Sequence, residues 1–204
     1  MKHALTIGLT GPSGAGKGTV SGICRRWGIP SIDADAVYHA LLVPPSACLD
    51  ALVFAFGNGI CSTDGSLNRS ALSAIVFAPG AGEELKRLNQ ITHRFVLDDI
   101  REQCRNLTDS DVPAVLVDAP LLYESGFDRE CDRVLAVLAD PDLRLRRIMA
   151  RDGLPTDAAL ARLHAQKPND FYRRADGILY NNASPADLEE PLRHLLTDWG
   201  VRLP

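Results

Sequence analysis

The chain has 204 residues, of which 46% are hydrophobic and 24% charged, and it carries a formal net charge of −4. This length and apolar content suit one globular domain that can bury a core. The acidic balance argues against broad binding of nucleic acid or of an anionic membrane, because both usually require a surplus of Lys and Arg. We therefore expect neither nucleic acid nor a membrane as a partner.

The cysteine pattern and the N-terminus bear on the cellular compartment. The five cysteines form no C-x-x-C pair and are too scattered for a zinc spacing or a disulfide framework, so we expect buried free thiols in a reducing compartment. The N-terminus has a lone Lys2, and the apolar segment Ala4–Thr10 before the glycine-rich loop has only seven residues, too few for a signal sequence. No apolar run approaches the roughly 18 residues that a membrane helix needs. The sequence therefore predicts a cytoplasmic protein.

The first elements predict a β-α-β unit. Ala4–Thr10 is apolar and partly β-branched, as in a buried strand of a parallel sheet, and it stops at a glycine. Thr19–Trp27 is expected to form a helix that ends before Gly28. Ile29–Ile32 is a short second strand that runs into Asp33. A strand, a helix and a strand in this order predict parallel pairing with a right-handed crossover.

The loop between this strand and helix predicts a nucleotide site. It reads GPSGAGKGT and contains the G-x-x-x-x-G-K pattern. Its glycines let successive N–H groups converge on a phosphate, and Lys17 can reach the transferring phosphates. The predicted nucleotide-binding residues are Pro12, Ser13, Gly14, Ala15, Gly16, Lys17, Gly18 and Thr19. The alternative, a glycine-rich turn without a ligand, explains neither the lysine nor the flanking elements.

The residue after the loop lysine departs from the general pattern. This position usually holds a Ser or Thr whose hydroxyl helps to bind Mg²⁺, whereas here it is Gly18, with Thr19 next. A glycine is normal at this position in nucleoside monophosphate kinases. Thr19 is our candidate for a contact to phosphate or, through water, to Mg²⁺.

A long stretch of helices separates the second and third predicted strands. Within residues 38–111, Ala71–Phe77 and Leu85–Ile100 have apolar positions at helical spacing. The stretch is too long for one crossover helix, so we expect a helical excursion that covers the acceptor substrate. We predict one domain over residues 1–204, with a core of about 1–37 and 112–204, this excursion, and a lid at about 144–170.

Three later runs predict the remaining strands. Ala114–Val117 ends in Asp118, Arg133–Leu138 ends in a polar turn, and Gly177–Tyr180 precedes two asparagines. Open α/β sheets bind ligands at the carboxyl ends of their strands. The predicted fold class is therefore α/β, a P-loop NTPase-type parallel sheet flanked by helices.

Three carboxylates are expected near this edge of the sheet. Phosphoryl transfer to a hydroxyl benefits from a carboxylate that takes the proton, and Asp33 fits this role best because it ends the second strand. Asp35 could instead cap the next helix. Asp118 suits a water-mediated contact to Mg²⁺, with a simple turn cap as the alternative.

An arginine-rich stretch supplies positive charge. At helical spacing Arg144, Arg147 and Arg151 share one face, whereas Arg146 points elsewhere. Opposite a phosphate loop such a face would stabilise charge on the transferred group, while the alternative is a solvated basic helix. The histidines are isolated, so from their spacing alone a capping or surface role is expected for each.

Together these residues resemble dephospho-coenzyme A kinase over about residues 5–184. The most specific segments are Ile32–Asp35 and Pro120–Glu124. The rest of the matching series is Ile7–Gly11, Leu67–Arg69 with Leu72, Val76-Phe77, Ile91 with His93, Asp118-Ala119, Arg147 with Arg151–Gly153, Ala161-Arg162 with Gln166, Ala175-Asp176, and Asn181-Asn182.

The resemblance implies an activity and a set of roles. The family transfers the γ-phosphate of ATP to the 3′-hydroxyl of dephospho-coenzyme A, the last step of coenzyme A synthesis, on a P-loop kinase core with a helical acceptor region and a lid. By this resemblance Asp33 is the base, Lys17 and Arg147 assist catalysis, and Arg147, Arg151 and Asn182 bind ATP. Its acceptor side comprises Asp33, Asp35, Arg69, His93, Leu121 and Glu124. The cofactors implied are ATP and Mg²⁺, and we expect a monomer or small homo-oligomer.

Some residues depart from the family pattern, and two other functions compete. Gly18 replaces the usual Ser, Asn68 the usual Asp, Arg94 the usual Pro and Arg144 a common Gln. We expect these changes to alter the affinity for ligands without abolishing activity. A cytidylate-type kinase would share the loop but has no place for Pro120–Glu124. A non-catalytic ATP-binding module would have no reason to keep Lys17, Asp33 and the arginines together.

Overall fold

The computed structural model describes residues 4–204. Its strands are β1 (Leu5–Thr10), β2 (Ser31–Asp33), β3 (Ala114–Asp118), β4 (Arg133–Leu138) and β5 (Gly177–Tyr180). Its α-helices are α1 (Lys17–Arg26), α2 (Ala34–Ala40), α3 (Ala47–Phe56), α4 (Arg69–Val76), α5 (Gly82–Thr108), α6 (Pro141–Asp152), α7 (Thr156–His164) and α8 (Glu189–Asp198). Short 3₁₀ turns are η1 (Asn58–Ile60), η2 (Phe127–Glu130), η3 (Asn169–Arg174) and η4 (Pro185–Leu188).

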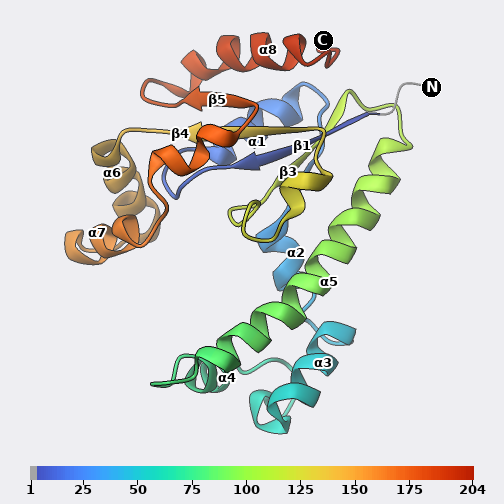
Figure 1. Ribbon diagram of the computed structural model, residues 1–204, viewed down its shortest axis with the longest axis vertical. Helices are drawn as coiled ribbons and strands as arrows, with labels where there is room; N and C mark the ends of the chain where they lie inside the picture. Colours follow the sequence, from blue (N-terminus) through green and yellow to red (C-terminus); the bar gives the residue numbers. More distant parts are fainter. Residues whose placement is uncertain (1–3) are drawn as a thin grey trace. The chain divides into compact units, whose positions relative to one another are not determined.

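The strands form a single five-stranded sheet in the order β2-β3-β1-β4-β5 (Figure 1). β1 pairs in parallel with β3 on one side and with β4 on the other, and β4 pairs in parallel with β5. β1 is therefore central, which explains its nearly continuous burial. The predicted fold class, a parallel sheet of the P-loop type flanked by helices, is confirmed.

Alternate side chains of the strands build the core on one face of this sheet. Ile7 and Leu9 of β1 join Leu135 and Val137 of β4 in a buried cluster. The same cluster includes residues of α1 and α8, and α8 runs beside β5 (Figure 1). Because side chains alternate between faces, Gly8 points the other way, where a Cβ would press on the side chain of Leu122 at 2.7 Å. The core thus fixes β1, and with it the point where the loop begins.

The chain divides into two compact units. The first unit consists of the residues up to Ile32 together with Cys104–Pro204, and the second unit consists of Asp33–Gln103. The second unit has an apolar cluster of its own, which includes Leu52 of α3, Ile60 of η1 and Leu72 of α4. Asn68 begins α4 as its N-cap, since its side chain accepts the Ala71 N–H at 3.0 Å.

The predicted elements largely agree with the observed ones, but several differ in extent: β2 is Ser31–Asp33 and not Ile29–Ile32, and α4 begins at Arg69, two residues before the predicted start. α1 begins at Lys17, two residues before the predicted start, because Gly16 in the left-handed region serves as its N-cap. α5 has 27 residues, far more than the predicted Leu85–Ile100. Arg94 lies inside it, at a position where a proline would remove a backbone hydrogen bond and break the helix.

The cysteines are free thiols, but only three of the five are buried as predicted. Cys24, Cys48 and Cys104 are buried, whereas Cys61 and Cys131 are partly buried. Burial raises the pKa of Cys24 and Cys131 to about 12 and that of Cys104 to about 11. Separately, none of the helices within residues 4–204 combines the length and apolarity that a membrane crossing requires.

Candidate functional site

The loop Gly11–Gly16 leaves the carboxyl end of β1 and leads into α1. Gly14 has φ +78°, and a Cβ there would lie 2.7 Å from the backbone oxygen of Arg144. Gly16 has φ +105°, and a Cβ there would overlap the side-chain amide of Asn181. Both positions combine a left-handed conformation with a close neighbour, so only glycine fits them. The loop is thus shaped to lie tightly against α6 and the segment after β5.

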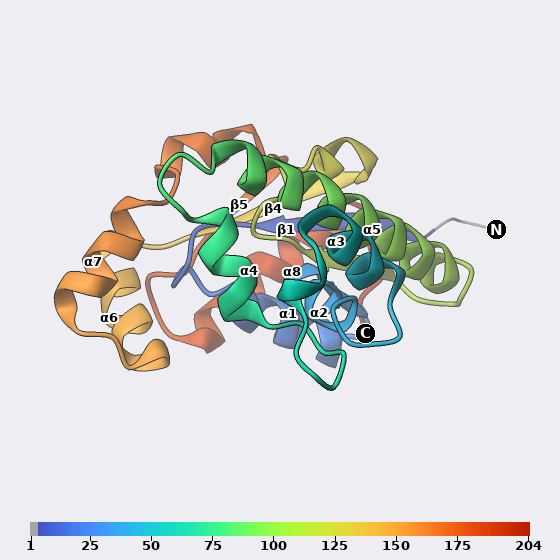
Figure 2. The same ribbon diagram turned by 90° about the horizontal axis from the view of Figure 1, so that it is seen from below.

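All three polar groups of Ser13 are bonded to the segment that contains α6 and α7. The Ser13 N–H donates to Gln166 Oε1 at 2.6 Å, and the Ser13 carbonyl accepts from Arg144 Nε at 3.0 Å. The Ser13 hydroxyl accepts from Arg151 Nη2 at 3.1 Å. We call residues 141–166 the α6–α7 segment. Its two helices lie side by side beyond the carboxyl end of β4 in both views (Figures 1 and 2).

Two arginines of α6 bring positive charge to the loop, and neither has a carboxylate partner in the part of the chain that the structure describes. Arg144 is only 4% exposed, and its hydrogen bonds go to the Ser13 carbonyl and to Gln166 Oε1 at 3.0 Å. Arg147 Nη1 donates to the Gly14 carbonyl at 3.2 Å, and its other acceptors are also neutral oxygens. Burial lowers the pKa of both guanidinium groups, as expected for cations removed from water. A buried cation is normally paired with an anion.

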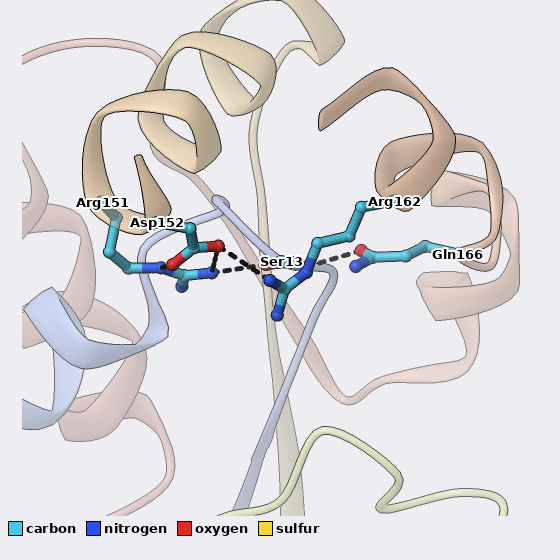
Figure 3. Close-up of polar contacts among 5 residues, drawn as sticks. All are labelled: Ser13, Arg151, Asp152, Arg162 and Gln166. Atoms are coloured by element: carbon cyan, nitrogen blue, oxygen red, sulfur yellow. Dashed lines mark hydrogen bonds and ion pairs between the residues drawn. The ribbon is translucent and has the colours of Figure 1, made fainter. Parts of the chain in front are cut away.

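Arg151, by contrast, is paired with a carboxylate. Its Nε and Nη2 contact the two oxygens of Asp152 at 2.7 and 2.9 Å, and Arg162 Nη1 of α7 contacts Asp152 Oδ2 at 2.8 Å. Figure 3 shows these groups beside Ser13 and Gln166. The hydrogen bond from Arg151 lowers the pKa of Asp152, and the same bond raises the pKa of Arg151. Asp152 therefore ties α6 to α7.

The face predicted for the arginines is present in α6. Arg144, Arg147 and Arg151 all donate to residues of the loop, whereas Arg146 is exposed. The alternative of a solvated basic helix is therefore wrong for Arg144 and Arg147, whereas Arg151 contacts the loop but keeps an exposed side chain.

The two asparagines after β5 take different partners. Asn181 is buried, donates from Nδ2 to the Ala15 carbonyl at 2.8 Å, and accepts from Arg147 Nη2 at 3.3 Å. Asn182 instead pairs with Asp140: its Oδ1 accepts the Asp140 N–H at 2.9 Å and its Nδ2 donates to Asp140 Oδ1 at 3.0 Å. Asn181 thus supports the loop, and Asn182, the predicted ATP-binding residue, holds the turn between β4 and α6.

The groups that would meet a nucleotide and a metal follow the loop. Lys17 opens α1, and its Nζ donates to the Gly11 carbonyl at 3.2 Å. Pro12 and Gly16 accept backbone N–H groups within the turn, at 3.2 Å from Ala15 and 3.0 Å from Thr19. Gly18 is exposed, and a Cβ there would have no atom within 4 Å.

A magnesium site can be tested against the oxygen donors present. Asp118 ends β3, and its Oδ2 lies 3.5 Å from the Ser21 hydroxyl of α1. Thr19 Oγ1 would be 3.8 Å from a Cβ on Gly16, so its hydroxyl lies beside the loop. Within residues 4–204 no group of three or more His, Cys, Asp or Glu side chains could hold a metal. One carboxylate and one hydroxyl suit a Mg²⁺ ion that takes its remaining ligands from phosphate and water.

Asp33 ends β2 and is the N-cap of α2. Its Oδ1 accepts the N–H groups of Asp35 at 2.9 Å and of Ala36 at 3.1 Å, and the side chain is exposed. Asp35 lies in the first turn of α2, so the alternative in which Asp35 caps this helix is wrong. Asp33 takes the cap position because it is the last extended residue before the helix.

The predicted acceptor residues of the second unit lie on its helices. Arg69, the first residue of α4, places Nη2 3.1 Å from His39 Nδ1 of α2, and both side chains are exposed. His93 is partly buried within α5.

The segment after β3 carries the other acceptor candidates. Leu121 is 54% exposed although it is apolar, and Glu124 is exposed. Burial raises the pKa of Tyr172, and the charge of Glu124 adds to this shift, so these side chains are near each other. Arg174 lies 3.6 Å from the ring centroid of Tyr123 and 4.2 Å from that of Phe171, a stacked arrangement of cation and aromatic rings.

Comparison with known proteins decides between the kinase families that share this loop. The dephospho-CoA kinase family model matches residues 5–187. The chain belongs to the dephospho-CoA kinase family. It is 40% identical over 196 residues to a dephospho-CoA kinase of Geobacillus kaustophilus, with 96% of each chain covered.

Solved structures agree with this family. The dephospho-CoA kinase from Campylobacter jejuni has a TM-score of 0.69 and 29% identity, and the match covers 95% of this chain and 96% of that one. A Thermus thermophilus protein, TT1252, has a TM-score of 0.79 and 35% identity, with 97% and 98% covered. The loop is shared with cytidylate-type kinases and does not separate the two families. The family match favours dephospho-CoA kinase over the cytidylate-type alternative.

Four residues of this dephospho-CoA kinase family member that contact the loop or hold α6 and α7 together were not predicted as site residues. Gln166 and Asn181 bond directly to the loop, and Asp152 and Arg162 hold Arg151 and α7. The only available signal was the resemblance, which places Asn181 with Asn182 near the adenine pocket and includes Gln166, Asp152 and Arg162 without giving them roles. None has a neighbouring motif that would reveal its partner.

Proposed function

We propose that this chain catalyses ATP-dependent phosphorylation of the 3′-hydroxyl of dephospho-coenzyme A, which gives coenzyme A and ADP. The observation that carries this proposal is the arrangement of Arg144 and Arg147 on the phosphate loop. Among the described residues, their positive charges have only neutral oxygen partners, at 3.0–3.5 Å, on Ser13, Gly14, Ala15, Gln166 and Asn181. A polyphosphate would supply the missing anion, and the charge would be available to the transferred group.

In the proposed reaction Asp33 acts as the general base. The acceptor 3′-hydroxyl oxygen forms a bond to the γ-phosphorus, the bond from that phosphorus to the β,γ-bridging oxygen breaks, and ADP leaves. Asp33 takes the hydroxyl proton. Its two backbone contacts both use Oδ1 and fix the carboxylate, which supports Oδ2 as the oxygen that receives the proton.

Lys17, Arg147 and Arg151 are proposed to bind the phosphates. Lys17 stands at the start of α1, where backbone N–H groups also favour an anion. Arg147 and Arg151 reach the loop from α6 and would stabilise charge as it shifts toward the leaving ADP. Asn182 is proposed to contribute to the adenine side through the turn that it holds with Asp140.

Mg²⁺ is the proposed metal, with Thr19 and Asp118 as the residues that would hold it, directly or through water. When bound it would neutralise charge on the phosphate oxygens. Because Gly18 supplies no hydroxyl, the protein offers fewer metal contacts than a loop with Ser or Thr at this position.

The acceptor is proposed to be bound by Asp35, Arg69, His93, Leu121 and Glu124. Arg69 and His39 form an exposed pair of basic groups, which suits an anionic acceptor such as dephospho-coenzyme A. Leu121 offers exposed apolar surface to the neutral parts of the same molecule.

A coupled assay of ADP release with separate acceptors tests the proposal. We expect turnover with dephospho-coenzyme A and little with CMP or AMP. Turnover with CMP but none with dephospho-coenzyme A would overturn the proposed acceptor. ATP binding without turnover on any of the three acceptors would instead support a non-catalytic ATP-binding module.

A further inference from the structure

Gln166 holds two groups of the loop region that are suited to an anion. Its Oε1 accepts the Ser13 N–H at 2.6 Å and Arg144 Nη2 at 3.0 Å. One donor is a backbone amide of the phosphate loop, and the other is a buried guanidinium that has no carboxylate partner within residues 4–204. The neutral amide oxygen occupies both donors, and both are of the kind that also donate to phosphate oxygens. For the neutral Ser13 N–H, a hydrogen bond to a charged oxygen is roughly twice as strong as one to a neutral oxygen.

The side chain that makes these contacts is carried by the end of α7. Gln166 follows the last turn of this helix, and its N–H donates to the Leu163 carbonyl at 3.3 Å. α7 is held to α6 by the contact of Arg162 Nη1 with Asp152 Oδ2 at 2.8 Å. Figure 3 shows this chain of contacts, from Arg162 and Asp152 to Arg151, and from Ser13 to Gln166. The position of Gln166 is therefore coupled to the whole α6–α7 segment.

We propose that Gln166 is a latch residue of the nucleotide site: its amide oxygen competes with a phosphate oxygen of the nucleotide for the Ser13 N–H and for Arg144. Nucleotide binding displaces this oxygen, and the end of α7 is thereby released from the loop. The inference rests on the proposed function in one respect, namely that the loop binds ATP. It adds a residue that opposes nucleotide binding and a route by which the nucleotide is sensed by α7.

The latch predicts the direction in which ATP affinity changes when the contacts of Gln166 are removed. When an intramolecular contact competes with the ligand, the apparent Kd equals the intrinsic Kd divided by the fraction of molecules in which the donors are free. The two contacts are worth a net amount typical of ordinary hydrogen bonds, so their removal is expected to tighten ATP binding on the order of five- to tenfold. A residue that instead contacts the nucleotide, or only stabilises the fold, would give weaker binding when truncated.

The dissociation constant of ATP, measured by calorimetry without acceptor, tests the proposal in Gln166→Ala and Gln166→Met. Met keeps the length of the side chain but has no oxygen, so both variants remove the acceptor and only Ala removes the bulk. We expect both to bind ATP more tightly than the unchanged protein. His164→Ala is the matched control, because His164 is exposed at the end of the same helix. Its ATP affinity is expected to be unchanged.

Steady-state kinetics and the Ser13 amide signal provide independent measurements. The KM for ATP should fall in the Gln166 variants while the KM for dephospho-coenzyme A stays the same, a split that a general loss of structure would not produce. Without nucleotide, hydrogen exchange of the Ser13 amide should be faster in Gln166→Met than in the unchanged protein. Arg162→Ala, which detaches α7 from Asp152, should shift ATP affinity in the same direction but less.

The outcomes separate this inference from the proposed function. Unchanged or weaker ATP binding in both Gln166 variants, with melting temperatures close to that of the unchanged protein, would overturn the latch and leave the kinase assignment intact. Failure of the unchanged protein to bind ATP would overturn the proposed function and the latch with it. Tighter binding in Ala but not in Met would also overturn the latch, since bulk rather than the acceptor oxygen would then be responsible.

Discussion

The Asn181 side-chain amide donates to the carbonyl of Ala15 at 2.8 Å, across 166 residues of the chain. This bond joins the segment after β5 to the loop after β1, and the two strands lie on either side of β4 in the sheet. The same asparagine accepts from Arg147 at 3.3 Å. One buried side chain therefore holds both the loop and an arginine that we propose to act on the phosphates.

Asn181→Ala should weaken ATP binding by about five- to fiftyfold and lower the free energy of unfolding by about 1–3 kcal/mol, because a buried carbonyl loses its donor. Urea denaturation and ATP calorimetry measure the two effects. Asn106→Ala is the matched control, since Asn106 is an exposed asparagine of α5 that lies outside every proposed binding site. Equal losses of affinity in the two variants would contradict the assigned role of Asn181.

Asp33→Asn should lower kcat by roughly 10²–10⁴ with little change in ATP affinity, because an amide cannot take the hydroxyl proton. An asparagine can still cap α2, so the fold should be retained. Asp35→Asn provides the comparison, since its side chain lies two residues on in the same helix. Near-normal turnover of Asp33→Asn would remove Asp33 as the base.

Arg147→Ala should lower kcat on the order of 10²–10³, as for the loss of one donor to a charged transition state. Arg146→Ala, on the exposed side of the same helix, should leave kcat within about twofold, because a surface substitution away from the site changes little. Steady-state rates at saturating substrates distinguish the two. A similar loss of kcat in both variants would show that disturbance of α6, and not loss of the Arg147 guanidinium, lowers the rate.

Gly18→Ser should be accepted by the fold, since a Cβ at this position meets no atom within 4 Å. Replacement of a helical glycine should raise the free energy of unfolding by about 0.5 kcal/mol. The new hydroxyl should lower the Mg²⁺ concentration needed for half-maximal activity, which a magnesium titration of the rate measures. An unchanged magnesium requirement would contradict a role of this position in binding the metal.

The three thiols whose pKa is raised most, those of Cys24, Cys104 and Cys131, should be unreactive in the folded chain. Their pKa values rise from 9.0 to about 11 for Cys104 and about 12 for Cys24 and Cys131, so the reactive thiolate is depleted near pH 8. A disulfide reagent should modify these three only after urea is added. Because unfolded thiols ionise near pH 9 while folded ones stay protonated, stability from this source should be present below pH 9 and fall above it. Rapid native labelling of Cys24 would contradict the assignment.

Much of this architecture could be predicted because the responsible signals are local in the sequence. A strand such as Arg133–Leu138 is recognised from its apolar run, and its predicted bounds match β4. The face shared by Arg144, Arg147 and Arg151 follows from the period of one helix, and all three residues contact the loop. The kinase family followed from short motifs at Ile32–Asp35 and Pro120–Glu124, and the family match bears it out.

The strands, the loop glycines and the residue types that surround a phosphate could all be recognised from local sequence patterns. Which neighbour of each motif reaches the loop depends on the packed fold: Asn181 does so and Asn182 does not, and Gln166 does so from a position 153 residues away. Sequence patterns do not give these contacts because adjacent side chains point in different directions. Their partners depend on how β5 and α7 pack beside the loop, and no local pattern of the chain encodes that packing.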